Sequence, residues 1–297
     1  MGAVPHPETL KQAASSLRSA VADGLSLDET QTLLGRLCSG FEPLGVTRSH
    51  HQVWYRSRIC DSANGYTNVR QLIYPSSGST QFARASRPGA KVLYAGWNVR
   101  LSMEEIGAKK GDTVQVILLR VRSPIEFPCV ILGEHQAIYN SGRSIVNSPI
   151  LESAFSRKLQ MRVERTLADV FVDSVLAELF REQHEKNDGY ATCAVFAERV
   201  LARGIGLIYP SVRTAHSANI AVRAEEFDAN FEVLGSDLYR VQDYHGYGLY
   251  VLKPIQSTWE IDTDGTFRWS SQRRPALTLG SRRDTLIPGD FRGWQPT

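Results

Sequence analysis

The spacing of apolar residues near the start of the chain predicts two helices. One helical face, at i, i+3, i+4 and i+7 spacing, is made by Leu10, Ala13, Ala14, Leu17, Ala20 and Val21. Gly24 ends this pattern. A second helix is indicated by a capping box, because the Ser26 hydroxyl can accept the N3 amide while Glu29 reaches back. Gly40 suits a left-handed C-terminal cap.

From Gly45 onward the pattern changes to short β-rich runs separated by turn residues. The predicted strands are 52–55, 91–95, 113–121, 127–132 and 204–209, with a Ser/Gly-rich loop at 75–80. A short helix is predicted over 102–108. We expect it to begin at a Ser102 cap, which puts Glu105 in its first turn.

The middle of the chain has the composition of helices. Residues 148–186 contain few helix breakers, and an apolar stripe is predicted at Val163, Leu167, Val170, Phe171, Val175 and Leu179. A further helix over 191–203 is ended by Gly204. A β-hairpin is predicted over residues 238–242 and 248–253. A strand pair is expected around Asp264, and it is followed by a tail rich in Pro, Gly and Arg.

Polar and aromatic residues stand at or after three of the predicted strands. The three pieces are Trp54-Tyr55-Arg56, the run from Arg84 through Tyr94 to Glu105, and Tyr209-Pro210-Ser211 followed by Asn219. They supply cations, an acid, a hydroxyl and aromatic faces. A folded sheet could bring all three to one cleft, where they would suit the binding of a dinucleotide and the breaking of a bond at its ribose.

In the order and spacing of these motifs the chain resembles the RES-domain family, named for its Arg, Glu and Ser, which includes NAD-consuming toxins of bacterial toxin–antitoxin pairs. Three stretches carry the resemblance: residues 53–56, residues 82–95 with the segment that follows as far as Glu105, and residues 208–211 with residues 217–221. The resemblance extends over about residues 46–255. It implies an ADP-ribosyltransferase-like α+β fold, with a twisted and largely antiparallel sheet core, surrounding helices and an N-terminal helical extension.

The resemblance assigns roles to individual residues. It implies catalytic roles for Glu105, Ser211 and Arg56, and substrate binding by Arg84, Tyr55, Tyr94, Tyr209 and Asn219. A carboxylate suits stabilisation of a ribosyl cation, and a guanidinium fork suits pyrophosphate. The family's Gly-Arg-aromatic-Asn run is here Ala83-Arg84-Ala85-Ser86, so Arg87 remains a rival for the role of Arg84.

The linear order predicts three segments. Residues 1–45 form a helical extension, 46–255 a RES-like catalytic domain with a helical insertion at about 148–203, and 256–297 a strand pair and a basic tail. Residues 267–297 contain six arginines and two aspartates. Since the whole chain has a net charge of +3, the rest of the chain is nearly neutral. That balance argues against direct nucleic-acid binding, although the tail could touch an anionic partner.

Other sequence features limit the class of protein. The four cysteines form no Cys-x-x-Cys pair and the histidines show no ligand spacing, so we expect neither a disulfide framework nor a metal. No signal-like core or membrane-length apolar run is present, which predicts a cytoplasmic protein that does not enter the membrane. His216 is a weak candidate base for a hydrolase.

The predicted function is cleavage of the nicotinamide N-glycosidic bond of NAD, by hydrolysis or phosphorolysis, with NAD as substrate and no resident cofactor. Two alternatives stay open: transfer of ADP-ribose to a protein, and a non-catalytic binding or antitoxin-partner module. The expected partners are NAD, a cognate antitoxin protein and a second copy of the chain. The two N-terminal helices are expected to pack on the catalytic domain or across a homodimer.

Overall fold

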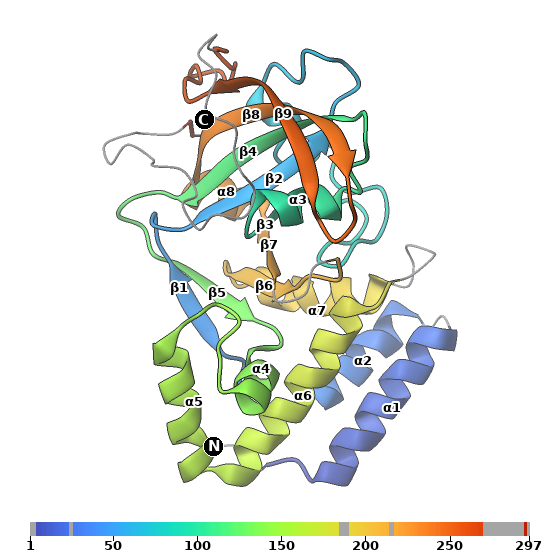
Figure 1. The fold of residues 1–297 in the computed structure, drawn as a ribbon. Helices are drawn as coiled ribbons and strands as arrows, with labels where there is room; N and C mark the ends of the chain where they lie inside the picture. The colour runs from blue at the N-terminus through green and yellow to red at the C-terminus, as the bar shows by residue number, and fades with distance from the viewer. Residues whose placement is uncertain (1–3, 24–25, 184–189, 214–216, 270–293, 296–297) are drawn as a thin grey trace. The chain divides into compact units, whose positions relative to one another are not determined.

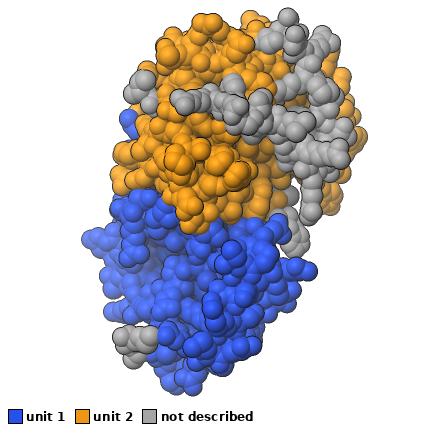
Figure 2. Space-filling view, turned by 90° about the vertical axis from the view of Figure 1, so that its left-hand side faces the viewer, with its two compact units in different colours: residues 1–46, 77–92, 128–212 blue, residues 47–76, 93–127, 213–297 orange. Residues whose placement is uncertain are grey.

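The computed structural model describes residues 4–23, 26–183, 190–213, 217–269 and 294–295, which contain eight α-helices and nine β-strands (Figure 1). The chain forms two compact units (Figure 2). Unit 1 is residues 1–46, 77–92 and 128–212, and unit 2 is residues 47–76, 93–127 and 213–297. The fold is mixed α and β, and its units cut across the three consecutive segments that the linear order predicts.

Unit 1 is mainly helical. Its helices are α1 (Pro7–Asp23), α2 (Leu27–Leu37), α4 (Glu134–Ser141), α5 (Pro149–Met161), α6 (Val163–Arg181) and α7 (Ala191–Leu201). Its strands lie in the order β1 (Gly45–Arg48), β5 (Phe127–Ile131) and β6 (Gly206–Pro210), and β5 and β6 run parallel. The end of β1, from Thr47, and the first residue of β5, Phe127, are counted with unit 2. Gly45 meets β5 closely, because a Cβ there would stand 2.8 Å from the carbonyl oxygen of Cys129.

The two N-terminal helices pack on α6 and α7 of the same unit. The predicted capping box at Ser26 and Glu29 is confirmed. Arg18 of α1 forms a 2.5 Å ion pair with Glu178 of α6, and Leu17 and Leu34 are fully buried. The helices are therefore covered by their own chain. Gly40 has the predicted left-handed conformation (φ +72°), but α2 is capped two residues earlier, at Cys38.

The apolar stripe predicted for α6 is partly wrong. Val163 and Leu167 at its start are exposed, whereas Asp169 and Asp173 are buried. The reason is that distant groups satisfy these carboxylates. Asp173 accepts the backbone N–H groups of Gly133 at 2.8 Å and Gln136 at 3.1 Å, and so caps the start of α4. The predicted helical stretch is also divided, because Arg162 (φ −146°, ψ 60°) separates α5 from α6.

Unit 2 is built on a largely antiparallel sheet. Its strands lie in the order β7 (Ala218–Arg223), β3 (Val92–Gly96), β2 (Val53–Ile59), β4 (Thr113–Val121), β8 (Phe231–Tyr244) and β9 (Tyr250–Thr258). The pairs β2–β3, β2–β4, β4–β8 and β8–β9 are all antiparallel. The sequence predicted β4 from end to end, and the expected hairpin is the longer β8–β9 pair. The expected strand pair near Asp264 is a single bridge between Ile261 and Phe267.

The helix α3 (Val99–Glu105) packs on one face of this sheet (Figure 1). Val99 and Met103 of α3 form a core with Tyr55, Val116 and other apolar side chains of the strands. Each fully buried side chain of this size contributes roughly 1.5–3 kcal/mol. The other helical segments of unit 2 are α8 (Ala224–Asn230) and a 3-10 turn at Val69–Gln71.

The predicted start of α3 is wrong. Asn98, rather than Ser102, is the N-cap: its side-chain oxygen accepts the Leu101 N–H at 2.8 Å. Ser102 lies inside the helix, and its hydroxyl is 2.6 Å from that of Ser57 on β2. Glu105 is consequently the last helical residue instead of a first-turn residue.

No described helix is long and apolar enough to cross a bilayer. Most of the basic tail and His216 lie outside the described residues. Arg268, which is described, forms a 2.6 Å ion pair with Asp262.

Candidate active site

The predicted site residues are divided between the two units. Tyr55, Arg56, Tyr94, Glu105 and Asn219 belong to unit 2. Arg84, Tyr209 and Ser211 belong to unit 1. A single cleft for all of them would join the two units, and it stays a prediction.

The structure brings Glu105 and Asn219 together. The side-chain amide of Asn219, on β7, donates a hydrogen bond of 2.8 Å to Oε1 of Glu105, at the end of α3. Asn219 is buried and Glu105 is half-buried. The amide therefore orients a carboxylate that remains partly accessible, which is a suitable state for a group that stabilises a cation.

Two further bonds hold the segment around Glu105. Ser102 precedes Glu105 by three residues, so the two lie on the same side of α3, and Ser102 contacts Ser57 of β2. The backbone N–H of Trp97, just before α3, donates to the Ala218 carbonyl at 3.2 Å. Because Ala218 adjoins Asn219, this bond ties the start of α3 to the strand that carries the amide.

Arg56 lies on the other face of the sheet from Tyr55. The strand β2 pairs with β4 without a bulge, so successive side chains alternate between faces. Tyr55 enters the core beneath α3, whereas Arg56 donates from Nε to the Leu72 carbonyl at 2.7 Å and from Nη1 to the Tyr94 carbonyl at 2.9 Å. These two bonds crosslink backbone segments of unit 2. A pyrophosphate role for Arg56 remains a prediction.

In unit 1, Arg84 and Tyr209 both contact Phe180 near the end of α6. Arg84 donates from Nε to the Phe180 carbonyl at 2.9 Å, and its guanidinium stands 4.9 Å from the ring centre of Tyr190. The rings of Tyr209 and Phe180 are 5.3 Å apart. Ser211 is buried just after β6.

The rival arginine, Arg87, has a different partner. Its Nη2 forms a 2.8 Å ion pair with Glu198 on α7. Both arginines are thus engaged within unit 1, Arg84 by helix-end carbonyls and Arg87 by a carboxylate. The choice between them as substrate ligand stays open.

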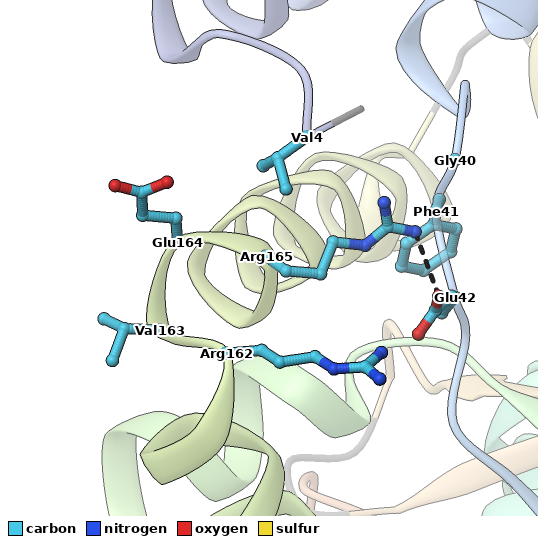
Figure 3. Close-up of a pocket in the computed structure, with 8 residues that line it drawn as sticks. All are labelled: Val4, Gly40, Phe41, Glu42, Arg162, Val163, Glu164 and Arg165. Carbon is cyan, nitrogen blue, oxygen red and sulfur yellow. Dashed lines mark ion pairs between the residues drawn. The ribbon is translucent and has the colours of Figure 1, made fainter. Parts of the chain in front are cut away.

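A large cavity in unit 1 contains none of the predicted site residues. It measures about 600 Å³ and is lined by Val4, Gly40, Phe41, Glu42, Arg162, Val163, Glu164 and Arg165 (Figure 3). Arg165 forms a 3.3 Å ion pair with Glu42 across it. Its two arginines are balanced by two glutamates, so the cavity has no marked preference for an anion.

Another cavity, of about 480 Å³, lies in unit 2. It is lined by Thr47, Arg48, Ser49, His51, Gln52, Val53, Tyr55 and Trp97. The sequence motifs identified Tyr55 but missed Arg48 and Trp97. One available signal was the position of Trp97 within the run that joins Tyr94 to Glu105.

Neither a metal nor a cysteine nucleophile is indicated in the described part of the chain. No group of three or more His, Cys, Asp or Glu side chains there could hold an ion. Burial raises the pKa of the Cys38 and Cys193 thiols to about 12 and that of Cys60 to about 11. These thiols stay protonated near neutral pH and are poor nucleophiles.

Comparison with protein-family models gives a match over part of the chain. Residues 146–245, about a third of the chain, match the family model of the RES domain. The matched stretch contains Tyr209, Ser211 and Asn219, while the other five predicted site residues precede it. Neither the curated proteins nor the solved structures contain a match to this chain.

Proposed function

The chain carries a RES domain, and from this premise we propose that it is an NAD-consuming enzyme that cleaves the nicotinamide N-glycosidic bond. Water or phosphate accepts the ribosyl group. We also propose that the antiparallel sheet of unit 2 is ADP-ribosyltransferase-like, and that the enzyme acts as a toxin restrained by a protein antitoxin. The bond between Asn219 and Glu105 is the observation that carries the catalytic part of this proposal.

The chemistry requires negative charge beside the sugar. As the bond from the ribose C1′ to the nicotinamide nitrogen breaks, the electron pair leaves with nicotinamide and positive charge develops on the ribose. A fixed carboxylate stabilises that transition state more than the neutral sugar of the ground state, and so accelerates the reaction. Glu105 has the required properties, because it is half-buried and held by an amide donor.

The remaining roles follow from the family resemblance. Ser211 donates a hydrogen bond to a ribose hydroxyl or to the nicotinamide amide. The guanidinium groups of Arg56 and Arg84 bind the pyrophosphate, and Tyr94 and Tyr209 offer rings for stacking. Each of these assignments is a proposal that substitution of the residue can test separately.

Product analysis tests the proposed reaction. Purified protein is incubated with NAD, with and without phosphate, and the products are identified by mass. Nicotinamide with ADP-ribose indicates hydrolysis, and nicotinamide with a phosphorylated ADP-ribose indicates phosphorolysis. ADP-ribose attached to protein would replace the proposal with protein modification. Intact NAD under all conditions would overturn it in favour of a non-catalytic module.

A further inference from the structure

The cavity of unit 2 has a lining that favours an anion. Arg48 contributes a permanent positive charge, and His51, Gln52 and two hydroxyl residues contribute polar groups. Among the described residues that line the cavity, none carries a carboxylate. An arginine in a concave, acid-free site attracts and orients phosphate oxygens, because its planar N–H fork matches their geometry.

The same cavity presents aromatic surface. The Arg48 guanidinium stands 5.9 Å from the ring centre of Trp97. The ring of Trp97 is 6.1 Å from that of the fully buried Trp54, and Tyr55 also lines the cavity. A guanidinium beside a supported indole is suited to a ligand that carries a phosphate next to a flat ring.

The cavity adjoins the segment that carries Glu105 and Asn219. Trp97 immediately precedes the N-cap residue of α3, and its N–H bonds to Ala218, the neighbour of Asn219. Tyr55 points to the sheet face that α3 covers, since it packs with Val99 and Met103 of that helix. The cavity is therefore linked to the segment that carries the Glu105 carboxylate by Tyr55 on β2, by Trp97 directly after β3 and by Ala218 on β7.

We propose that this cavity binds the phosphate-bearing nucleoside half of the dinucleotide substrate, with Arg48 as the phosphate ligand and Trp97 as the ring platform. The inference rests on the proposed function for the identity of the substrate. A volume of about 480 Å³ lies within the range of about 300–1,000 Å³ that is usual for small-molecule sites. Arg48 thus adds a phosphate ligand to the guanidinium groups of Arg56 and Arg84, which the resemblance assigns to the pyrophosphate.

Calorimetric titration with AMP and with adenosine tests the assignment. AMP is expected to bind the full-length protein, and Arg48→Gln is expected to weaken AMP binding about tenfold or more through loss of a charge-assisted hydrogen bond. Adenosine, which lacks the phosphate, should respond little to this change. Arg70→Gln is the matched control, because it removes the same charge from an exposed position outside the cavity and should bind AMP like the wild type.

A second variant separates loss of the phosphate contact from misfolding of the protein. Arg48→Lys keeps the charge and the aliphatic stem but loses the planar fork, so it should fold like the wild type and still bind AMP more weakly. Absence of AMP binding to the wild type, or equal AMP binding by the Arg48 and Arg70 variants, would overturn the inference.

The outcomes separate this inference from the proposed function. If AMP binding depends on Arg48 while NAD stays intact, the cavity is a nucleotide site and the proposed reaction fails. If NAD is cleaved and Arg48→Gln changes neither AMP binding nor KM for NAD, the proposed reaction stands and the assignment of the cavity fails.

Discussion

The side-chain amide of Asn219 donates a 2.8 Å hydrogen bond to the carboxylate of Glu105, a residue 114 positions earlier in the chain. The bond joins the end of α3 to the strand β7. It fixes the direction of the one carboxylate for which the family resemblance implies stabilisation of a ribosyl cation. The amide is buried, so its loss would remove a protected hydrogen bond that orients the carboxylate.

Asn219→Ala should slow NAD cleavage about tenfold, the scale of one hydrogen bond to a charged group. NAD binding should change by a few-fold at most, because the bond acts on Glu105 rather than on the substrate. Steady-state kinetics would separate kcat from KM. Asn64→Ala, at an exposed position of the same unit, is the control and should leave both constants unchanged. A change confined to KM would contradict this orienting role and favour the substrate-binding role that the resemblance implies for Asn219.

Arg56→Lys should lower the free energy of unfolding by about 1–3 kcal/mol, since a lysine ammonium cannot reproduce the two guanidinium bonds to the Leu72 and Tyr94 carbonyls. Chemical denaturation would measure the change. Arg58→Lys on the same strand should have a smaller effect, because the Arg58 guanidinium is exposed over the Tyr66 ring and its bond to the Gln71 carbonyl is exposed too. Equal stability of the two variants would show that the Arg56 bonds contribute little.

Some elements were predictable because local signals decided them. The apolar run of residues 113–121 alone predicts β4, and the capping box at Ser26 alone predicts the start of α2. Both elements are found as predicted. The start of α3 was not decided locally. Asn98 and Ser102 are both good cap residues, and burial of Ser102 against Ser57 selects the earlier start.

Contacts between distant segments explain the other errors. The apolar stripe predicted for α6 is partly wrong because Asp173 is buried at a position where an apolar residue is usual. The backbone amides that stabilise its side chain come from the N-cap and the first turn of α4. The Glu105–Asn219 contact likewise joins separate parts of the chain, so spacing alone gives no sign of it. The motifs and the family resemblance placed both residues in the predicted site without predicting the contact between them. The cavity residue Arg48 was missed because it belongs to no motif, and Trp97 was missed because no role was assigned to its position in the run from Tyr94 to Glu105.

The stability of the protein should depend on pH through Asp173. Burial, aided by the charge of Glu134, raises the pKa of this carboxyl to about 7 against the opposing effect of the Gly133 and Gln136 amides. A folded pKa above the unfolded value of about 3.9 means that the folded state binds the proton more tightly. The stabilising contribution is complete below about pH 4 and is lost as the pH rises through about 7.

Asp173→Asn should remove this dependence, because the amide side chain stays neutral. Unfolding free energies at about pH 5 and about pH 8 should show the variant gaining stability relative to the wild type at the higher pH. The exposed Asp28→Asn should follow the wild type. Parallel pH dependence of the wild type and Asp173→Asn would contradict the raised pKa.

Removal of residues 1–42 should destabilise unit 1. Leu17, Leu34 and Leu37 are completely buried, and each such side chain contributes roughly 1.5–3 kcal/mol. We expect a lower unfolding temperature and, by light scattering, association through the uncovered faces of α6 and α7. If the shortened protein were equally stable and unchanged in oligomeric state, the helices would be available for another partner.

A milder test uses two point variants. Leu34→Ala should cost about 2–5 kcal/mol through the cavity that it leaves. Lys11→Ala, on the exposed side of α1, should cost little.

The central claim is that the Glu105 carboxylate stabilises the transition state of NAD cleavage. The most direct measurement compares NAD turnover and NAD binding for the wild type, Glu105→Gln and the exposed control Glu126→Gln. Glu105→Gln should bind NAD within a few-fold of the wild type but cleave it at least about a hundredfold more slowly, a loss of about 2.7–4 kcal/mol, while the control cleaves normally. Unchanged turnover by a folded Glu105→Gln protein would contradict the claim.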